Sequence, residues 1–187
     1  MFNLLSAVLF TVIICAAPVA AQNNEISFSV GGGSLIGADD GRQIGADDSR
    51  GARAYTLAYA RYLTERWALE GSAEDFSIKS RQVFDPHRES YIGLQASALY
   101  HILPASADRR FVPYLTAGIG FTTPDPTEIP PVSVIRLGGG FKYFFGQSRT
   151  FGLRVEARNE IINDNRIFFP PQRINFPSAR VGVVYRF

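Results

Sequence analysis

The alternation of apolar and polar side chains along almost the whole chain is the feature that most restricts how this sequence can fold. From residue 24 onward the pattern has a period of two, which is typical of β-strands. Most of the alternating segments are 10 to 14 residues long, whereas strands of soluble sheets usually have about 5–6 residues. The segments are 25–35, 52–63, 67–78, 90–103, 111–122, 132–145, 150–161 and 179–187. We therefore expect an all-β protein of eight strands, each long enough to cross a bilayer at a tilt.

The connections between these segments alternate in length. Three are short: "TER" at 64–66, "PASADRR" at 104–110 and "GQSR" at 146–149. The other four are longer and occupy residues 36–51, 79–89, 123–131 and 162–178. Short turns at one end, long loops at the other and an even strand number are typical of an outer-membrane barrel, in which the short turns and both termini face the periplasm.

The two faces of each strand differ in charge. In the segment 150–161, Phe151, Leu153 and Val155 share one face, and Arg154 and Glu156 share the other. In a soluble barrel of the lipocalin kind, the apolar face lines a ligand cavity and the charges meet water. In a membrane barrel, the apolar face meets lipid and the charges point inward. A lipid-facing arginine near the membrane midplane costs about 2–4 kcal/mol, whereas an inward arginine can pair with a carboxylate.

Aromatic residues favour the membrane barrel over the soluble one. On the apolar faces they gather where the strands meet the short turns: Tyr59, Trp67, Tyr100, Phe111, Tyr143, Phe145, Phe151, Tyr185 and Phe187. A ring of Tyr, Trp and Phe at one level is typical of a membrane interface, and a soluble barrel has no reason to collect them there. We therefore predict a closed, antiparallel, up-and-down transmembrane β-barrel with short periplasmic turns and long extracellular loops.

Four stretches resemble a known family. They are "VPYLTAGIGF" at 112–121, "LGGGFKYFF" at 137–145, "GLRVEAR" at 152–158 and "RVGVVYRF" at 180–187. Over residues 23–187 the chain resembles the OmpA/OmpX-type eight-stranded outer membrane β-barrels. It departs from OmpA, which carries a soluble peptidoglycan-binding domain after its barrel, so no wall-anchoring function is expected.

This resemblance implies a location, partners and a role. The location is the outer membrane of a Gram-negative bacterium, in contact with outer membrane lipids and lipopolysaccharide. The terminal segment resembles the signal read by the barrel-assembly machinery, carried by Arg180, Gly182, Tyr185 and Phe187. Periplasmic chaperones are further partners expected during biogenesis. The implied role is structural or adhesive, with the cell-surface loops contacting an extracellular ligand.

The first 21 residues form a separate segment. They carry no charged side chain, have an apolar run from Leu4 to Ala17, and end in small residues. Val19 and Ala21 suit secretory cleavage, so we predict a signal peptide at 1–21 and a barrel domain at 22–187. An uncleaved N-terminal membrane helix is the alternative. The net charge of +2 argues against nucleic acid as a partner.

Inward-facing charges are expected to fill the barrel, because eight strands leave an interior just wide enough for side chains. The predicted network consists of Glu70, Glu74, Arg136, Lys142, Arg154, Glu156, Arg158, Glu160, Arg180 and Arg186. An unpaired buried charge is costly, so opposite charges should interlace. We interpret this network as a structural plug, and a narrow ion channel is the alternative.

Two of the long loops have unusual compositions. The first repeats "IGADD" at 36–40 and 44–48, and its aspartates could gather divalent cations. We interpret it as a solvated loop, because ordered Ca²⁺ sites need about six oxygens in fixed geometry. The fourth contains Phe168, Phe169 and Phe176, which suggest a recognition surface. Alternatively, these phenylalanines fold onto the membrane interface or cap the barrel mouth.

Catalysis is the remaining alternative, because lipid-A-modifying hydrolases and acyltransferases exist on small outer-membrane barrels. Asp85, His87, Glu89 and Ser90 have the residue types of a catalytic triad. Triads are recognised by geometry rather than by adjacency, however, and one flexible loop holds such geometry poorly. The second histidine, His101, lies in a predicted strand. We expect that the protein is not an enzyme and that it binds neither a cofactor nor a metal. A catalytic role for His87 and Ser90 is left open.

Overall fold

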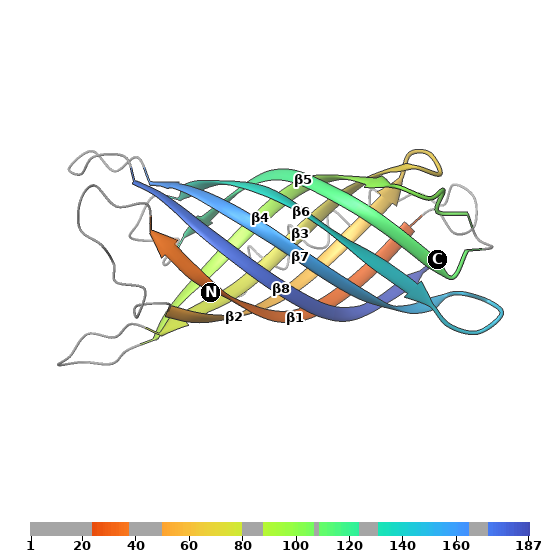
Figure 1. Ribbon diagram of the computed structural model, residues 1–187, viewed down its shortest axis with the longest axis horizontal. Coiled ribbons are helices and arrows are strands. Elements are labelled where there is room, and N and C mark those ends of the chain that lie inside the picture. The colour runs from red at the N-terminus through yellow and green to blue at the C-terminus, as the bar shows by residue number, and fades with distance from the viewer. Residues whose placement is uncertain (1–23, 38–49, 80–87, 107–108, 124–130, 165–171) are drawn as a thin grey trace, which may run out of the picture.

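The computed structural model describes residues 24–37, 50–79, 88–106, 109–123, 131–164 and 172–187. Over these residues it is a closed barrel of eight strands, in which each strand pairs antiparallel with the next and β8 pairs with β1 (Figure 1). The strands are β1 (Asn24–Gly37), β2 (Arg50–Tyr62), β3 (Trp67–Lys79), β4 (Arg88–His101), β5 (Phe111–Thr123), β6 (Val132–Phe144), β7 (Phe151–Asp164) and β8 (Gln172–Arg186). The predicted fold class is confirmed.

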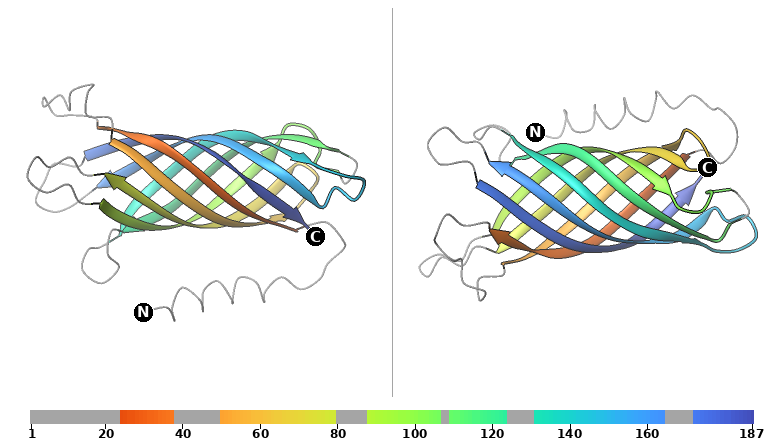
Figure 2. Two further views of the ribbon diagram at one scale, coloured as in Figure 1. Left: turned by 90° about the horizontal axis from the view of Figure 1, so that it is seen from below. Right: turned by 45° about the horizontal axis from the view of Figure 1, so that its top comes forward.

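The two ends of the barrel differ, as the connection lengths predict. The β2–β3, β4–β5 and β6–β7 turns lie at one end together with the C-terminus (Figures 1 and 2). At this short-turn end the first and last strands are joined by reciprocal backbone hydrogen bonds between Asn24 and Phe187, at 3.1 and 3.0 Å. The four long connections leave the opposite end, which we call the loop end.

The outward face is apolar and ends in aromatic rings. Trp67 contacts Tyr100 with ring centroids 4.9 Å apart, and Phe151 contacts Tyr185 at the same distance. Both pairs lie at the short-turn end, where Phe111, Tyr143, Phe145 and Phe187 are also exposed. Tyr59 is half-buried, and its hydroxyl donates to Asn24 Oδ1 at 2.8 Å.

No helix among the described residues is long and apolar enough to span a membrane.

Strand β8 differs most from its prediction, because it begins at Gln172 rather than near residue 179. Pro177 suggests a loop, since proline cannot donate a backbone hydrogen bond and rarely occupies a central strand. The barrel accommodates it by interrupting the β1–β8 ladder, in which register pairs join Gly33 to Ser178 and Ile36 to Asn175 but none joins Ser34 to Pro177. Pairing with β7 continues through Pro177, opposite Asn159.

The prediction that Phe176 belongs to a surface loop is therefore wrong. Phe176 lies inside β8, points into the barrel and is 0 % exposed. It stacks on Phe76 with ring centroids 5.9 Å apart, and Ala52 and Ala54 complete the cluster. The alternative, in which this side chain caps the mouth of the barrel, agrees with its position. Phe168 and Phe169 lie outside the described residues, as do the segment 1–21 and the aspartates of the first loop.

Glycines opposite the arginines make room for large side chains inside a narrow barrel. Each of four inward arginines has a glycine as its cross-strand partner on one side: Gly118 with Arg136, Gly182 with Arg154, Gly138 with Arg158 and Gly31 with Arg180. A Cβ atom at Gly138 would lie 2.6 Å from Arg158 Cβ, closer than any packed pair of carbon atoms.

Substituting Gly138 by alanine is therefore expected to lower the free energy of unfolding by about 1–3 kcal/mol, because the new Cβ would clash with Arg158 Cβ and the Ala157 carbonyl oxygen and β7 would have to shift. Gly71→Ala is the matched control, since Gly71 faces outward on β3 and a Cβ there meets nothing within 4 Å. Urea unfolding of the refolded protein in lipid vesicles measures both. Equal stability of the two variants would contradict this account of glycine.

Candidate functional site: the charged interior

All ten predicted interior residues face the inside of the barrel, and each is at most 5 % exposed. They come from β3, β6, β7 and β8. The structure arranges them, together with residues that the sequence did not single out, as three connected groups along the barrel axis.

The group nearest the loop end consists of two carboxylates and three arginines. Arg136 Nη2 lies 3.0 Å from both Glu74 Oε2 and Glu160 Oε1. Arg158 Nη2 lies 3.0 Å from Glu160 Oε1 and also pairs with Glu74. Arg180 pairs with Glu74 as well. Glu74 therefore contacts all three guanidinium groups, from β6, β7 and β8.

The middle group surrounds Arg154. Its Nη2 lies 2.5 Å from Glu156 Oε2 and 3.1 Å from Glu70 Oε1. Tyr114 links the same groups, since its hydroxyl donates to Glu156 Oε2 at 2.7 Å and accepts from Arg154 Nε at 2.8 Å. Arg158 Nη1, 3.3 Å from Glu156 Oε1, joins this group to the first.

The third group lies at the short-turn end and is centred on Glu25, which the sequence prediction missed. Glu25 pairs with Lys142, accepts a hydrogen bond from Arg186 Nε at 3.0 Å and accepts another from the Tyr62 hydroxyl at 2.6 Å. The alternation of side chains could have identified it. Glu25 lies two residues before the buried Ser27 and so on the same, inward face of the strand, whereas Ile26 between them faces outward. Glu25 is the first residue of the predicted segment 25–35, so the alternation supports its inward position from one side only.

The interior is filled rather than open. Within the described residues it holds six buried cations against five buried carboxylates, which leaves one excess positive charge. One gap of about 10 Å³ separates Arg154 from Arg180, bounded also by Ser27, Ser29 and Thr56. That is about the space of one water molecule.

Apolar clusters close both ends of this polar column. Phe76 and Phe176 lie at the loop end. At the short-turn end, Leu99 and Val112 are completely buried, and Ala105 of the β4–β5 turn packs against the clusters that contain them. Charged side chains that are buried, paired and capped in this way join strands on different sides of the barrel and fill the interior of its described part.

Only some of the residues considered for catalysis lie in the part of the chain that the structure describes. His101 is 0 % exposed inside the barrel, stacked on Tyr62 with ring centroids 5.0 Å apart. Ser90 lies outside, near the loop end, and donates to Asp75 Oδ1 at 3.0 Å. Asp85 and His87 lie outside the described residues. In the described ranges, no group of three or more potential metal ligands occurs.

The residues of the predicted assembly signal divide between the two faces. Arg180 and Gly182 face inward, whereas Tyr185 and Phe187 face outward and stack with ring centroids 5.7 Å apart. Their role as a signal remains a prediction.

Comparison with known proteins extends these observations. Residues 7–187 match the family described as outer membrane protein beta-barrel domain. The neisserial surface protein A structure aligns at TM-score 0.62 and 12 % identity, covering 90 % of this chain and 100 % of that one. The N-terminal β-barrel domain of Pseudomonas aeruginosa OprF aligns at 0.54 and 16 %, with coverage of 90 % and 100 %. The outer membrane enzyme PagL aligns at 0.57 and 14 %, with coverage of 83 % and 97 %. No curated protein sequence matches this chain.

Proposed function

Because this chain belongs to the outer membrane protein beta-barrel domain family and is itself an outer membrane protein, we propose that it is a closed scaffold with a structural or adhesive role at the cell surface. Its four long connections, near residues 38–49, 80–87, 124–130 and 165–171, then meet the cell's surroundings. The observation that supports this proposal is the interior of the described strands, which three groups of paired charges fill and in which the gap between Arg154 and Arg180 measures about 10 Å³.

The proposal is tested on bacterial cells that display the protein. Shortening each long connection in turn to a tight turn leaves the described strands intact. Adhesion to epithelial monolayers and sensitivity to detergent are then compared with cells lacking the protein. We expect at least one shortened connection to reduce adhesion or to raise detergent sensitivity toward the level of those cells. Identical adhesion and identical sensitivity with and without the protein would refute the proposal.

Ion conduction gives a separate prediction. Protein refolded and inserted into planar bilayers is expected to show no sustained conductance steps, because the charged groups are capped by apolar clusters at both ends. A porin inserted in the same bilayers provides the positive control. Stable, reproducible steps from this protein would favour the channel instead.

An enzymatic role on lipid A is distinguished by mass spectrometry of lipid A from cells with and without the protein. We expect identical spectra. A shift of one acyl chain that disappears with His87→Ala would replace the scaffold proposal with a hydrolase or acyltransferase.

A further inference from the structure

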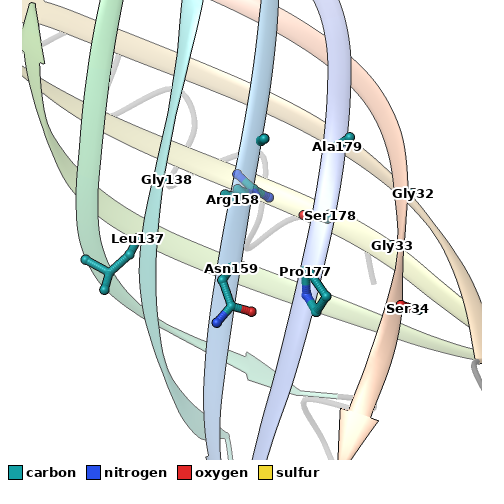
Figure 3. A pocket seen from close by; sticks show the side chains of 11 residues that line it. Gly32, Gly33, Ser34, Leu137, Gly138, Arg158, Asn159, Pro177, Ser178 and Ala179 are labelled. Carbon is teal, nitrogen blue, oxygen red and sulfur yellow. The ribbon is translucent and has the colours of Figure 1, made fainter. Parts of the chain in front are cut away.

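A shallow hollow of about 590 Å³, open to the surroundings over most of its extent, lies on the outer wall of the barrel, on the face that contacts lipid. It extends across β6, β7, β8 and β1 (Figure 3). Outward-facing residues of these strands line it: Leu137, Ala157, Asn159, Pro177, Ala179, Gly32 and Ser34. Small side chains form most of this lining, while Leu137 stands at one margin.

The hollow coincides with the interruption of the β1–β8 ladder. Ser34 and Pro177, which lack a register pair across β1 and β8, both line it. Pro177 has no backbone N–H to donate to this ladder, and lipid chains offer no replacement donor. Ser34 and Asn159 add a hydroxyl and an amide to the same wall. The hollow thus combines room for an apolar chain with polar groups, unlike the neighbouring wall formed by Val181 and Val183.

Its height places the hollow in the outer leaflet. Ala179 and Pro177 lie about 20 and 27 Å along β8 from Tyr185, which belongs to the aromatic ring at the short-turn end. At a strand tilt of about 40°, these distances correspond to roughly 16 and 21 Å along the membrane normal, within an apolar band about 25 Å tall. The long connections leave the barrel at this end, which is the extracellular end in this family.

An exposed arginine lies beside the hollow. Arg53 faces outward on β2 as the direct cross-strand partner of Gly32. No ion pair joins Arg53 to another described residue. An arginine on the wall of a membrane barrel is destabilising away from the interface, and a phosphate beside it relieves this cost through bidentate hydrogen bonding.

We propose that the hollow and Arg53 together bind one lipopolysaccharide molecule of the outer leaflet. An acyl chain lies in the hollow, and a phosphate of the lipid A headgroup binds the Arg53 guanidinium. The amide and ester groups at the roots of the acyl chains lie level with Ser34, Asn159 and the interruption of the β1–β8 ladder. This site lies on the barrel wall and does not depend on the role proposed for the loops.

Native mass spectrometry of the refolded protein, titrated with purified lipid A, tests the site. Two variants test the two parts of the site independently: Ala179→Phe fills the hollow, and Arg53→Gln removes the positive charge. Matched controls make the same changes elsewhere on the outward face. Ala117→Phe lies on β5, and Arg61→Gln lies on β2 near the short-turn end. The slower gel mobility of boiled samples shows that each variant is folded.

We expect one lipid A per barrel, and each site variant should weaken the apparent affinity by about fivefold or more, the effect of roughly one surface charge. The controls should stay within about twofold of the wild type. Equal binding by site variants and controls would overturn the proposal. Phosphatidylglycerol binding as strongly as lipid A would also overturn it, as would a barrel dimer that Ala179→Phe disrupts while lipid A binding persists.

Discussion

Replacing Glu74 by glutamine is expected to lower the free energy of unfolding of the barrel by about 3–5 kcal/mol, the range found when one partner of a buried ion pair is removed. Glu74 contacts Arg136, Arg158 and Arg180, and its side chain is 1 % exposed. After the substitution, Glu160 alone would face three guanidinium groups. Glutamine fills nearly the same space as glutamate, so the loss is electrostatic.

Urea unfolding of the refolded protein in lipid vesicles measures this loss. Trp67, the only tryptophan, is exposed in the aromatic ring at the short-turn end, so its fluorescence reports the transfer from lipid to water. Asp75→Asn is the matched control, because Asp75 is the next residue on β3 and faces outward. We expect that control to stay within about 0.5 kcal/mol of the wild type.

A second substitution distinguishes loss of stability caused by unpaired charges from loss caused by disrupted packing. Adding Arg180→Met to Glu74→Gln removes one of the cations that has lost its partner, and apolar replacements of buried charges are often tolerated. Part of the lost stability should return, so the two effects should not add. If Glu74→Gln is no less stable than Asp75→Asn, the network does not stabilise the barrel as we describe.

Phe176→Ala is expected to cost about 3–5 kcal/mol, the usual range for truncating a fully buried phenylalanine. Phe176 is 0 % exposed between Phe76, Ala52 and Ala54, and a cavity would remain because the alanines cannot fill it. The same urea titration applies. Phe121→Ala, an exposed phenylalanine on the outward face of β5, is the control and should cost much less.

This substitution also tests the surface role that the sequence suggested for Phe176. Unchanged stability combined with reduced adhesion of cells that carry Phe176→Ala would mean that the side chain is available to a partner. If Phe176→Ala lowers the free energy of unfolding but leaves adhesion per folded molecule equal to that of the wild type, the result agrees with the buried position of Phe176.

The sequence by itself determined the number of strands, their faces and the end at which the aromatic rings gather. These features depend on alternation along one strand, and alternation is local because successive side chains of a strand point to opposite faces. Glu70, Arg154 and Arg180 could therefore be assigned to the interior, although not to any particular partner. Phe176 was misplaced for an equally local reason, since Pro177 next to it suggests a loop.

Only the tertiary structure decided which charges meet. Glu74 of β3 contacts Arg180 of β8 across the barrel, and Glu25 of β1 contacts Lys142 of β6. Such contacts depend on the stagger of the strands around a closed barrel, to which all eight pairings contribute. The hollow beside Arg53 has the same origin, because it forms where β6, β7, β8 and β1 bring small residues together and where Pro177 interrupts the ladder. Alternation within one strand cannot specify a neighbour on another, so these features arise only when the barrel closes.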